Sequence, residues 1–317
     1  MCALNQETSL LNLQQFLLRR FIQTVPLLLV VLILVFSLTR LTGDPATLVL
    51  GDNATPESVQ QLRNDWGLND PLPIQFMHYL GDLLTGDMGQ SLRYTRPVLA
   101  MITERLGASL LLVFASIALS TVISIPLGIL AAVRWKRPSD TMIRIGVVIG
   151  QAVPRFFLGI LLILLFGLRL GWVPTSGYGF ASHIILPAIT LATPTIALLT
   201  RLVRSSMLEV LNSDYIRTAR SKGLSEPRVL YTHAFRNSLM APVTMLAIQA
   251  AQLVGSAVVV EQVFAWPGLG RLALDAIYAR DFPVIQGIVL VFCLIVIGAN
   301  VLVDLSYALI NPQVRIG

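Results

Sequence analysis

The sequence predicts an all-α membrane protein that crosses the bilayer six times and carries a long outer loop after its first span. Two properties of the composition support this prediction: 55% of the 317 residues are hydrophobic, and only 13% are charged. Soluble domains carry about 25% charged residues, and the mean hydropathy of +0.74 is correspondingly high. The composition therefore excludes a soluble globule and a disordered chain, and the presence of only two cysteines excludes a disulfide scaffold.

Long uncharged stretches place the six helices, since a membrane-spanning helix needs about 20 apolar residues. Five stretches contain no Asp, Glu, Lys or Arg, and a sixth is interrupted only by Arg155. The stretch 170–200 begins with a segment rich in Gly, Pro and Ser that is typical of a loop, so its helix is expected from Ile184. The expected spans are 18–39, 106–133, 142–168, 184–203, 238–260 and 284–308. Prolines are expected to kink some of these helices, namely Pro126, Pro154, Pro187 and Pro194.

The first span is interpreted as an uncleaved helix and not as a signal peptide. Arg19 and Arg20 precede it, as a signal peptide would require. Its apolar run, however, is longer than the usual 7–15 residues, and no small-residue cleavage site follows. Residues 1–17 are then a short cytoplasmic extension.

The distribution of basic residues sets the expected orientation. With a cytoplasmic N-terminus, the inner segments hold 14 of the 23 Lys and Arg residues, and the longer outer segments hold eight. This asymmetry matches the positive-inside rule. We therefore expect both termini in the cytoplasm, extracytoplasmic loops at 40–105 and 261–283, a cytoplasmic loop at 204–237 and a cytoplasmic tail at 309–317. The basic residues lie where the membrane topology requires them, so the net charge of +6 does not indicate that the protein binds nucleic acid.

The outer loop 40–105 is long enough to form structure of its own. Thr55 and Pro56 are typical of a helix start, and a second short helix is expected near 74–84. Turns are expected at Gly43-Asp44-Pro45 and at Gly86-Asp87-Met88-Gly89. The segment 86–91 also has a superficial likeness to a phosphate-binding loop, and we interpret it as a turn cluster.

The inner loop contains the most specific pattern in the chain. Asp214 is placed to begin a helix and Gly223 to end it in a left-handed conformation. Apolar and basic side chains alternate along this helix, so it is suited either to anionic lipid or to a groove on a soluble partner. The segment comprises Asp214, Tyr215, Ile216, Arg217, Thr218, Ala219, Arg220, Ser221, Lys222, Gly223 and Leu224.

The residue types of metal and catalytic sites are scattered. His78, His183 and His233 are isolated in the sequence, and a structural role is expected for each, with transient nickel contact as the alternative for the first two. Cys2 and Cys293 lie too far apart in the topology to form a bridge. No catalytic residue and no metal ligand are predicted. Arg155 is expected either to reach the membrane interface or to act in a gate or in an ion pair at the subunit interface.

The segment 214–224, continued through Ala234-Phe235-Arg236-Asn237-Ser238-Leu239 and Pro242, resembles the EAA loop of binding-protein-dependent ABC import permeases. Further motifs resemble the first permease subunit of dipeptide, oligopeptide, nickel and glutathione importers, and the resemblance covers about residues 16–315. The motifs are 43–45, 86–91, 260–270, 280–286 and Asn311-Pro312.

Two departures from the family pattern limit what the resemblance implies. Arg217-Thr218-Ala219 stands where the motif has its name-giving Glu-Ala-Ala, so a Glu-specific salt bridge to the ATPase does not carry over. The extension before the first span is also longer than expected.

The resemblance implies a type I ABC importer permease fold and a set of partners. These are a second six-helix permease subunit, two cytoplasmic ABC ATPases and an extracytoplasmic solute-binding protein. The chain has only two lysines, neither in a phosphate-loop motif, so ATP and Mg are expected on the ATPases and the chain is not expected to be an enzyme. The resemblance makes 214–224 the coupling helix. Docking of the binding protein is expected at Asp44, Asp87, Trp266, Pro267, Gly268, Arg280 and Asp281, although the Trp266 turn is equally expected merely to pack.

The expected function is therefore that of a permease in a bacterial inner membrane, forming half of a pathway for peptides. Nickel or a metal chelate is the alternative substrate. An ion-coupled secondary transporter is an alternative of another class, but it would need acidic residues that the interiors of the first five spans lack. An integral membrane enzyme is a third class, for which the sequence shows no paired carboxylates and no Ser-His arrangement.

Overall fold

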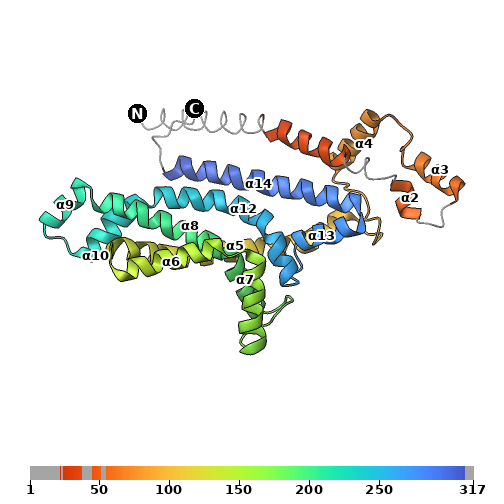
Figure 1. The fold of residues 1–317 in the computed structure, drawn as a ribbon. Helices are drawn as coiled ribbons and strands as arrows, with labels where there is room; N and C mark the ends of the chain where they lie inside the picture. Colours follow the sequence, from red (N-terminus) through yellow and green to blue (C-terminus); the bar gives the residue numbers. More distant parts are fainter. Residues whose placement is uncertain (1–21, 23, 38–44, 51–54, 311–317) are drawn as a thin grey trace, which may run out of the picture. The chain divides into compact units, whose positions relative to one another are not determined.

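The computed structural model describes residue 22 and residues 24–37, 45–50 and 55–310 (Figure 1). The fold is 81% helical, and the described residues contain no strand. The predicted all-α class is therefore confirmed. The N-terminal extension 1–17, Asp44 and most of the tail 309–317 lie outside the described residues.

The helices follow one another along the chain with short connections. Besides an apolar helix at Thr24–Ser37, they are α2 (Pro45–Leu50), α3 (Pro56–Asp65), α4 (Leu72–Thr85), α5 (Val98–Val133), α6 (Pro138–Ala152), α7 (Arg155–Leu162), η1 (Ile163–Arg169), η2 (Ala181–Ile184), α8 (Ile185–Leu211), α9 (Asp214–Ser221), α10 (Glu226–Arg228), η3 (Val229–Phe235), α11 (Arg236–Ser238), α12 (Met240–Val263), α13 (Leu269–Ala279) and α14 (Phe282–Ile310).

Four segments in the described part of the chain are long and apolar enough to cross a membrane: α5, η2 with α8, α12 and most of α14. A fifth is obtained if α6 and the α7–η1 segment together form one span. The helix at Thr24–Ser37 is apolar but shorter, within the expected first span. The exact number of six spans and their boundaries stay a prediction.

The third span is expected at 142–168 as one helix, but in the structure this segment is broken near its middle. α6 ends at Ala152, α7 begins at Arg155, and the two axes are bent by 105°. Pro154 has no N–H to continue the helix, and its ring pushes Val153 into an extended conformation (φ −76°, ψ 123°). The predicted kink at this proline is therefore a full break.

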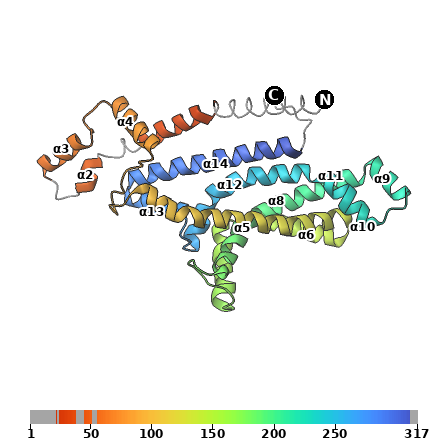
Figure 2. The same ribbon diagram turned by 180° about the vertical axis from the view of Figure 1, so that it is seen from behind.

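The chain divides into two compact units, which we describe separately. The larger unit contains residues 107–271 and the end of α14, and in it α8 packs against both α6 and α12 (Figures 1 and 2). Gly128 on α5 allows close approach to α8, because a Cβ there would lie 2.6 Å from the Val203 side chain and 3.0 Å from the Thr200 carbonyl oxygen. The core of this unit is therefore built around α8.

The smaller unit contains residues up to Leu106 together with 272–297. Its α3 begins as the sequence predicts, with the Thr55 side chain accepting a hydrogen bond from the Ser58 N–H. Its α4 places Phe76 and Tyr79 against Phe36, with ring centroids 5.4 and 5.8 Å from the Phe36 ring. These contacts attach the outer-loop helices to the Thr24–Ser37 helix.

The segment 86–91 is a turn, as interpreted from the sequence. Gly86 ends α4 in the left-handed conformation (φ +84°). Asp87 Oδ1 then accepts a hydrogen bond from the Gly89 N–H at 2.8 Å, which is the geometry of an Asx turn.

Candidate coupling and docking sites

The predicted coupling segment is a two-turn helix, α9, with defined ends. Ser213 precedes it in an extended conformation and Asp214 occupies its first turn. At the other end Gly223 has a φ of +77°, and its N–H donates to the Arg220 carbonyl at 2.9 Å. The sequence prediction of a helix that starts at Asp214 and ends at a left-handed glycine is confirmed.

One face of α9 is buried in the larger unit. Ile216 and Ala219 contact a cluster of apolar side chains from α5, α8 and η3. Tyr215, which the sequence grouped with these apolar residues, is instead 44% exposed, and its hydroxyl accepts a hydrogen bond from Asn237 Nδ2 at 3.1 Å. Two apolar side chains therefore anchor α9 in the core, while the more exposed Tyr215 is hydrogen-bonded to Asn237 of α11.

The outer face of α9 is polar and basic. Asp214, Arg217, Thr218, Ser221 and Lys222 are exposed. Of the basic side chains, Arg217 Nη1 lies 3.3 Å from Asp214 Oδ1. Arg220 Nε lies 2.8 Å from Glu226 Oε1 in the following helix. Both pairs are exposed, so their main effect is to fix the position of the guanidinium groups and not to stabilise the fold.

A buried ion pair that sequence reasoning missed lies between α6 and α8. The Asp140 carboxylate is buried, and Arg204 reaches it with two hydrogen bonds, of 2.7 Å from Nε and 2.8 Å from Nη2. The Lys136 N–H donates to the same carboxylate at 3.2 Å. Asp140 lies in the first turn of α6, but the sequence gives no signal that pairs it with Arg204, 64 residues further along the chain. This pair holds α8 against α6 at Arg204, seven residues before α8 ends. The chain then continues into α9.

Trp266, a predicted docking residue, is 1% exposed in the structure. Its Nε1–H donates to the Ala108 carbonyl at 2.9 Å, and its ring meets that of Tyr178 edge-on at 4.9 Å. Pro267 is half-buried and Gly268 is buried beside it. The side chain of Trp266 therefore packs within the larger unit, and any docking at this turn would use its backbone and neighbours.

Glu261 is a buried carboxylate that organises the same turn. Its Oε1 accepts a hydrogen bond from the Ser109 hydroxyl at 2.6 Å, and its Oε2 accepts one from the Arg271 N–H at 3.0 Å. The Ser109 Oγ in turn accepts from the Leu269 N–H at 2.7 Å. Carboxylates stabilise helix N-termini by satisfying such free N–H groups. Glu261 thus joins α5, the end of α12 and the start of α13.

Asp281 has a similar role in the smaller unit. Its side chain is 2% exposed and accepts hydrogen bonds from the Ser91 hydroxyl and from the N–H groups of Leu92 (3.1 Å) and Arg93 (3.4 Å). Arg280 before it has a positive φ of +54° and is exposed. Asp281 therefore holds the turn at 91–93 against the start of α14.

The predicted docking residues thus fall into two classes. Asp87 and Arg280, both in the smaller unit, are exposed and available to a partner. Trp266, Gly268 and Asp281 are buried, and they position surface turns. The docking role of the set stays a prediction.

Within the described residues there is no group of three or more His, Cys, Asp or Glu side chains arranged to hold a metal ion. Arg155 follows the break after α6, and its Nε is buried without a hydrogen-bond partner among the described residues. A gate role or an ion pair at the subunit interface stays a prediction for this residue.

Comparison with known protein families shows to which family the chain belongs. The family model described as "Binding-protein-dependent transport system inner membrane component" matches residues 124–316, and the model of its N-terminal region matches residues 13–113. The chain belongs to this family. It is a membrane permease component of ABC importers and not an enzyme, since the ATPase of such importers is a separate subunit.

Full-length relatives narrow the family to its peptide branch. This permease is 40% identical over 312 residues to the oligopeptide transport system permease protein AppB of Bacillus subtilis, covering 95% of this chain and 99% of the relative. It is 42% identical over 302 residues to the glutathione transport system permease protein GsiC of Pectobacterium atrosepticum, covering 95% and 98%. These matches confirm the resemblance drawn from the sequence motifs.

A solved structure supports the fold. The permease matches a chain of the MetNI methionine ABC transporter, solved in inward-facing conformations, with a TM-score of 0.58 and 18% identity. The match covers 67% of this chain and 96% of that chain. At this level of identity the likeness concerns the fold alone.

Proposed function

We propose that this permease forms half of the translocation pathway of an ATP-driven importer for peptides. A second six-helix permease forms the other half, two ABC ATPases bind ATP and Mg, and an extracytoplasmic solute-binding protein delivers the peptide. The names of the relatives support peptides as the cargo, because they are oligopeptide and glutathione permeases.

The single observation that carries the proposal is the construction of α9. Its inner face is anchored by Ile216 and Ala219 in a core shared with α5 and α8, and Arg217, Thr218 and Lys222 on its outer face are exposed. A displacement of α9 by a partner is therefore transmitted to the long helix α8, which ends three residues before α9 begins. This is the arrangement that coupling to a soluble ATPase requires.

The exposed polar residues of the outer segments are the proposed contacts for the binding protein. Asp87 and Arg280 provide charges of both signs on the smaller unit. The buried carboxylates of Glu261 and Asp281 hold the adjoining turns in place through hydrogen bonds. Asp44, which lies outside the described residues, stays in the proposed set by sequence alone.

Nickel or a metal chelate is the second candidate substrate. His78 and His183 motivated it, but His183 Nδ1 accepts a hydrogen bond from the Phe180 N–H at 3.3 Å, which gives it a local structural role. Family membership decides against the ion-coupled secondary transporter considered from the sequence.

Co-purification tests the proposal directly. When the tagged chain is extracted from its native membrane, we expect two ATPase subunits and a second permease to remain bound. In proteoliposomes this complex should take up a peptide only when ATP and the solute-binding protein are both present. Recovery of the chain alone, or uptake that is independent of ATP, would contradict the proposal.

Orientation is tested by cysteine labelling in a variant that lacks both native cysteines. A cysteine at Ser221, on the exposed face of α9, should react only with a reagent that reaches the cytoplasm, because the loop 204–237 is proposed to be cytoplasmic. A cysteine at Thr85, exposed at the end of α4, should react with a membrane-impermeant reagent added outside. The opposite pattern would reverse the proposed topology.

A further inference from the structure

A shallow groove of about 330 Å³ runs along one exposed face of α6 in the larger unit. Its lining residues recur at intervals of three and four, so they form one stripe along the helix. In chain order they are Thr141, Arg144, Ile145, Val148 and Ile149. The groove is therefore polar and basic at the end near the start of α6, and apolar at the other end.

The basic end of the groove adjoins the turn between α5 and α6. Residues 134–137 form this turn, and all four are exposed. Arg137 is the N-cap residue of α6, one helical turn before Thr141. Together with Arg144, the turn brings four exposed basic side chains into residues 134–144, where Asp140 is the only acidic residue.

Asp140 does not neutralise this charge. Its carboxylate is 1% exposed and is already paired with Arg204 through two hydrogen bonds. Arg144 Nε lies 3.7 Å from the same carboxylate, and the Arg144 side chain is 57% exposed. One carboxylate thus faces two guanidinium groups, so positive charge remains beside the groove and attracts an anion.

The turn itself has a defined conformation. Lys136 has a φ of +62°, and its N–H donates to Asp140 Oδ2 at 3.2 Å. The Lys136 Nζ lies 4.4 Å from the centroid of the Trp135 ring, which is a cation–π contact. The Trp135 side chain is 53% exposed. Tryptophan is enriched at the membrane–water interface, so this ring is suited to the depth of the lipid headgroups.

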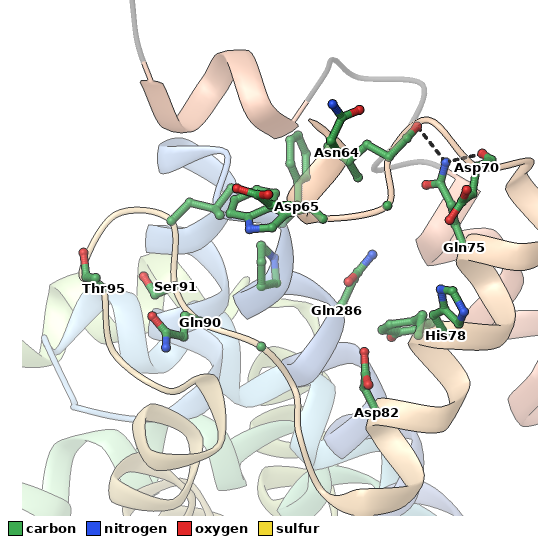
Figure 3. Close-up of a pocket in the computed structure, with 18 residues that line it drawn as sticks. Asn64, Asp65, Asp70, Gln75, His78, Asp82, Gln90, Ser91, Thr95 and Gln286 are labelled. Carbon is green, nitrogen blue, oxygen red and sulfur yellow. Dashed lines mark hydrogen bonds between the residues drawn. The ribbon is translucent and has the colours of Figure 1, made fainter. Parts of the chain in front are cut away.

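A hollow in the smaller unit has the opposite charge (Figure 3). It measures about 990 Å³ and is lined by Asp65, Asp70 and Asp82, with no Lys or Arg among the described residues of its wall. Figure 3 places Asp65 and Asp82 on opposite sides of this hollow. Its acidic lining repels an anion, so of the two hollows only the groove on α6 suits one.

From these observations we infer that the groove on α6 binds one anionic phospholipid. Arg137 and Arg144 contact the phosphate, and the upper part of an acyl chain lies along Ile145, Val148 and Ile149. Basic side chains next to a membrane-spanning helix attract anionic headgroups, and the apolar stripe follows them within two helical turns. The occupant is therefore a lipid and not a second protein chain. With the proposed cytoplasmic N-terminus, this lipid belongs to the inner leaflet.

Native mass spectrometry tests the inference. The chain is purified in detergent with the partners that it retains, freed of lipid, and titrated with phosphatidylglycerol or with phosphatidylcholine of the same acyl chains. The quantity compared is the affinity for the first lipid bound. We expect phosphatidylglycerol to bind at least about ten-fold more tightly, because only its headgroup carries a net negative charge for the basic side chains. Excess inorganic phosphate should not displace it, because phosphate lacks the acyl chain.

Three double variants locate the site. Arg137→Gln with Arg144→Gln should weaken phosphatidylglycerol binding at least about ten-fold, since two charges near the headgroup are lost. Asp140 keeps Arg204 as its partner in this variant. Arg137→Lys with Arg144→Lys keeps the charge and should retain most of the affinity.

Arg93→Gln with Arg169→Gln is the matched control, because both residues are exposed and lie in the proposed outer segments. Their removal should change the affinity by no more than about two-fold, because a bilayer core of about 30 Å exceeds the Debye length.

Several outcomes would overturn the inference. Equal binding of phosphatidylcholine would remove the role of the headgroup charge, and displacement by inorganic phosphate would show a site for phosphate alone. Unchanged binding in the glutamine variant, accompanied by release of a second permease, would make this face a subunit interface. An equal loss in the lysine variant or in the control would show that the groove is not the site. The inference does not depend on the cargo, so each of these results leaves the proposed function standing.

Discussion

Replacing Gly223 by valine is expected to reduce peptide uptake at least ten-fold while the complex still assembles and hydrolyses ATP. Gly223 has a φ of +77°, and a Cβ built on it meets no atom within 4 Å, so the substitution acts through backbone conformation and not through a clash. For an L-residue the left-handed conformation costs about 1–2 kcal/mol, and a β-branched residue is especially poor there. The end of α9 would then change shape, and we expect uptake to fall at least ten-fold at a given rate of ATP hydrolysis.

Asparagine at Gly223 is the matched control, because asparagine tolerates the left-handed conformation. Gly223→Asn should retain most of the uptake. Both variants are measured in proteoliposomes by parallel assays of ATP hydrolysis and peptide accumulation. If Gly223→Val transports as well as the native chain, the assignment of α9 as the coupling helix is wrong.

Replacing Gly268 by alanine is expected to destabilise the turn before α13. A Cβ at this position would lie 2.2 Å from Cδ and Oε1 of Glu261. That carboxylate has little freedom to move, because it is buried and held by Ser109 and Arg271. Overpacking a buried position costs about 1–3 kcal/mol, and displacement of the carboxylate would also leave buried N–H and O–H groups unpaired.

Thermal unfolding of the purified complex, followed by size-exclusion chromatography with fluorescence detection, measures this effect. We expect Gly268→Ala to lower the midpoint by several degrees. Gly255→Ala in α12 is the control, since a Cβ at Gly255 meets nothing within 4 Å and alanine favours a helix. Equal midpoints for the two variants would show that the Glu261 cluster does not stabilise the turn.

Local sequence signals predicted local structure well. The caps of α3 and α9 follow from Thr55, Asp214 and Gly223, because a cap depends on residues within one helical turn. The motif 214–224 also identified the family, since it combines several residue types at fixed spacing. At Pro154 the same kind of signal predicted a kink, but the degree of bending depends on what the two halves pack against.

The candidate sites show the limit of such signals. Trp266 and Asp281 belong to motifs of the family, and the sequence predicted a docking role for both, with packing as an equal alternative for the turn at Trp266. In the structure their side chains are buried and bonded within the chain. A motif shows that a residue matters at its position, but whether its side chain faces a partner or the interior depends on the neighbouring elements.

Composition and helix caps were enough to predict a helical membrane protein, and the resemblance of its motifs to a known family predicted the importer permease class. These properties are sums over many residues or depend on adjacent residues, so they can be recognised along the chain. The Asp140–Arg204 pair and the Glu261 cluster join residues that lie far apart in the sequence. Such pairs form only when the helices pack, because hydrogen bonds act over about 3 Å and the sequence does not specify which distant atoms come that close.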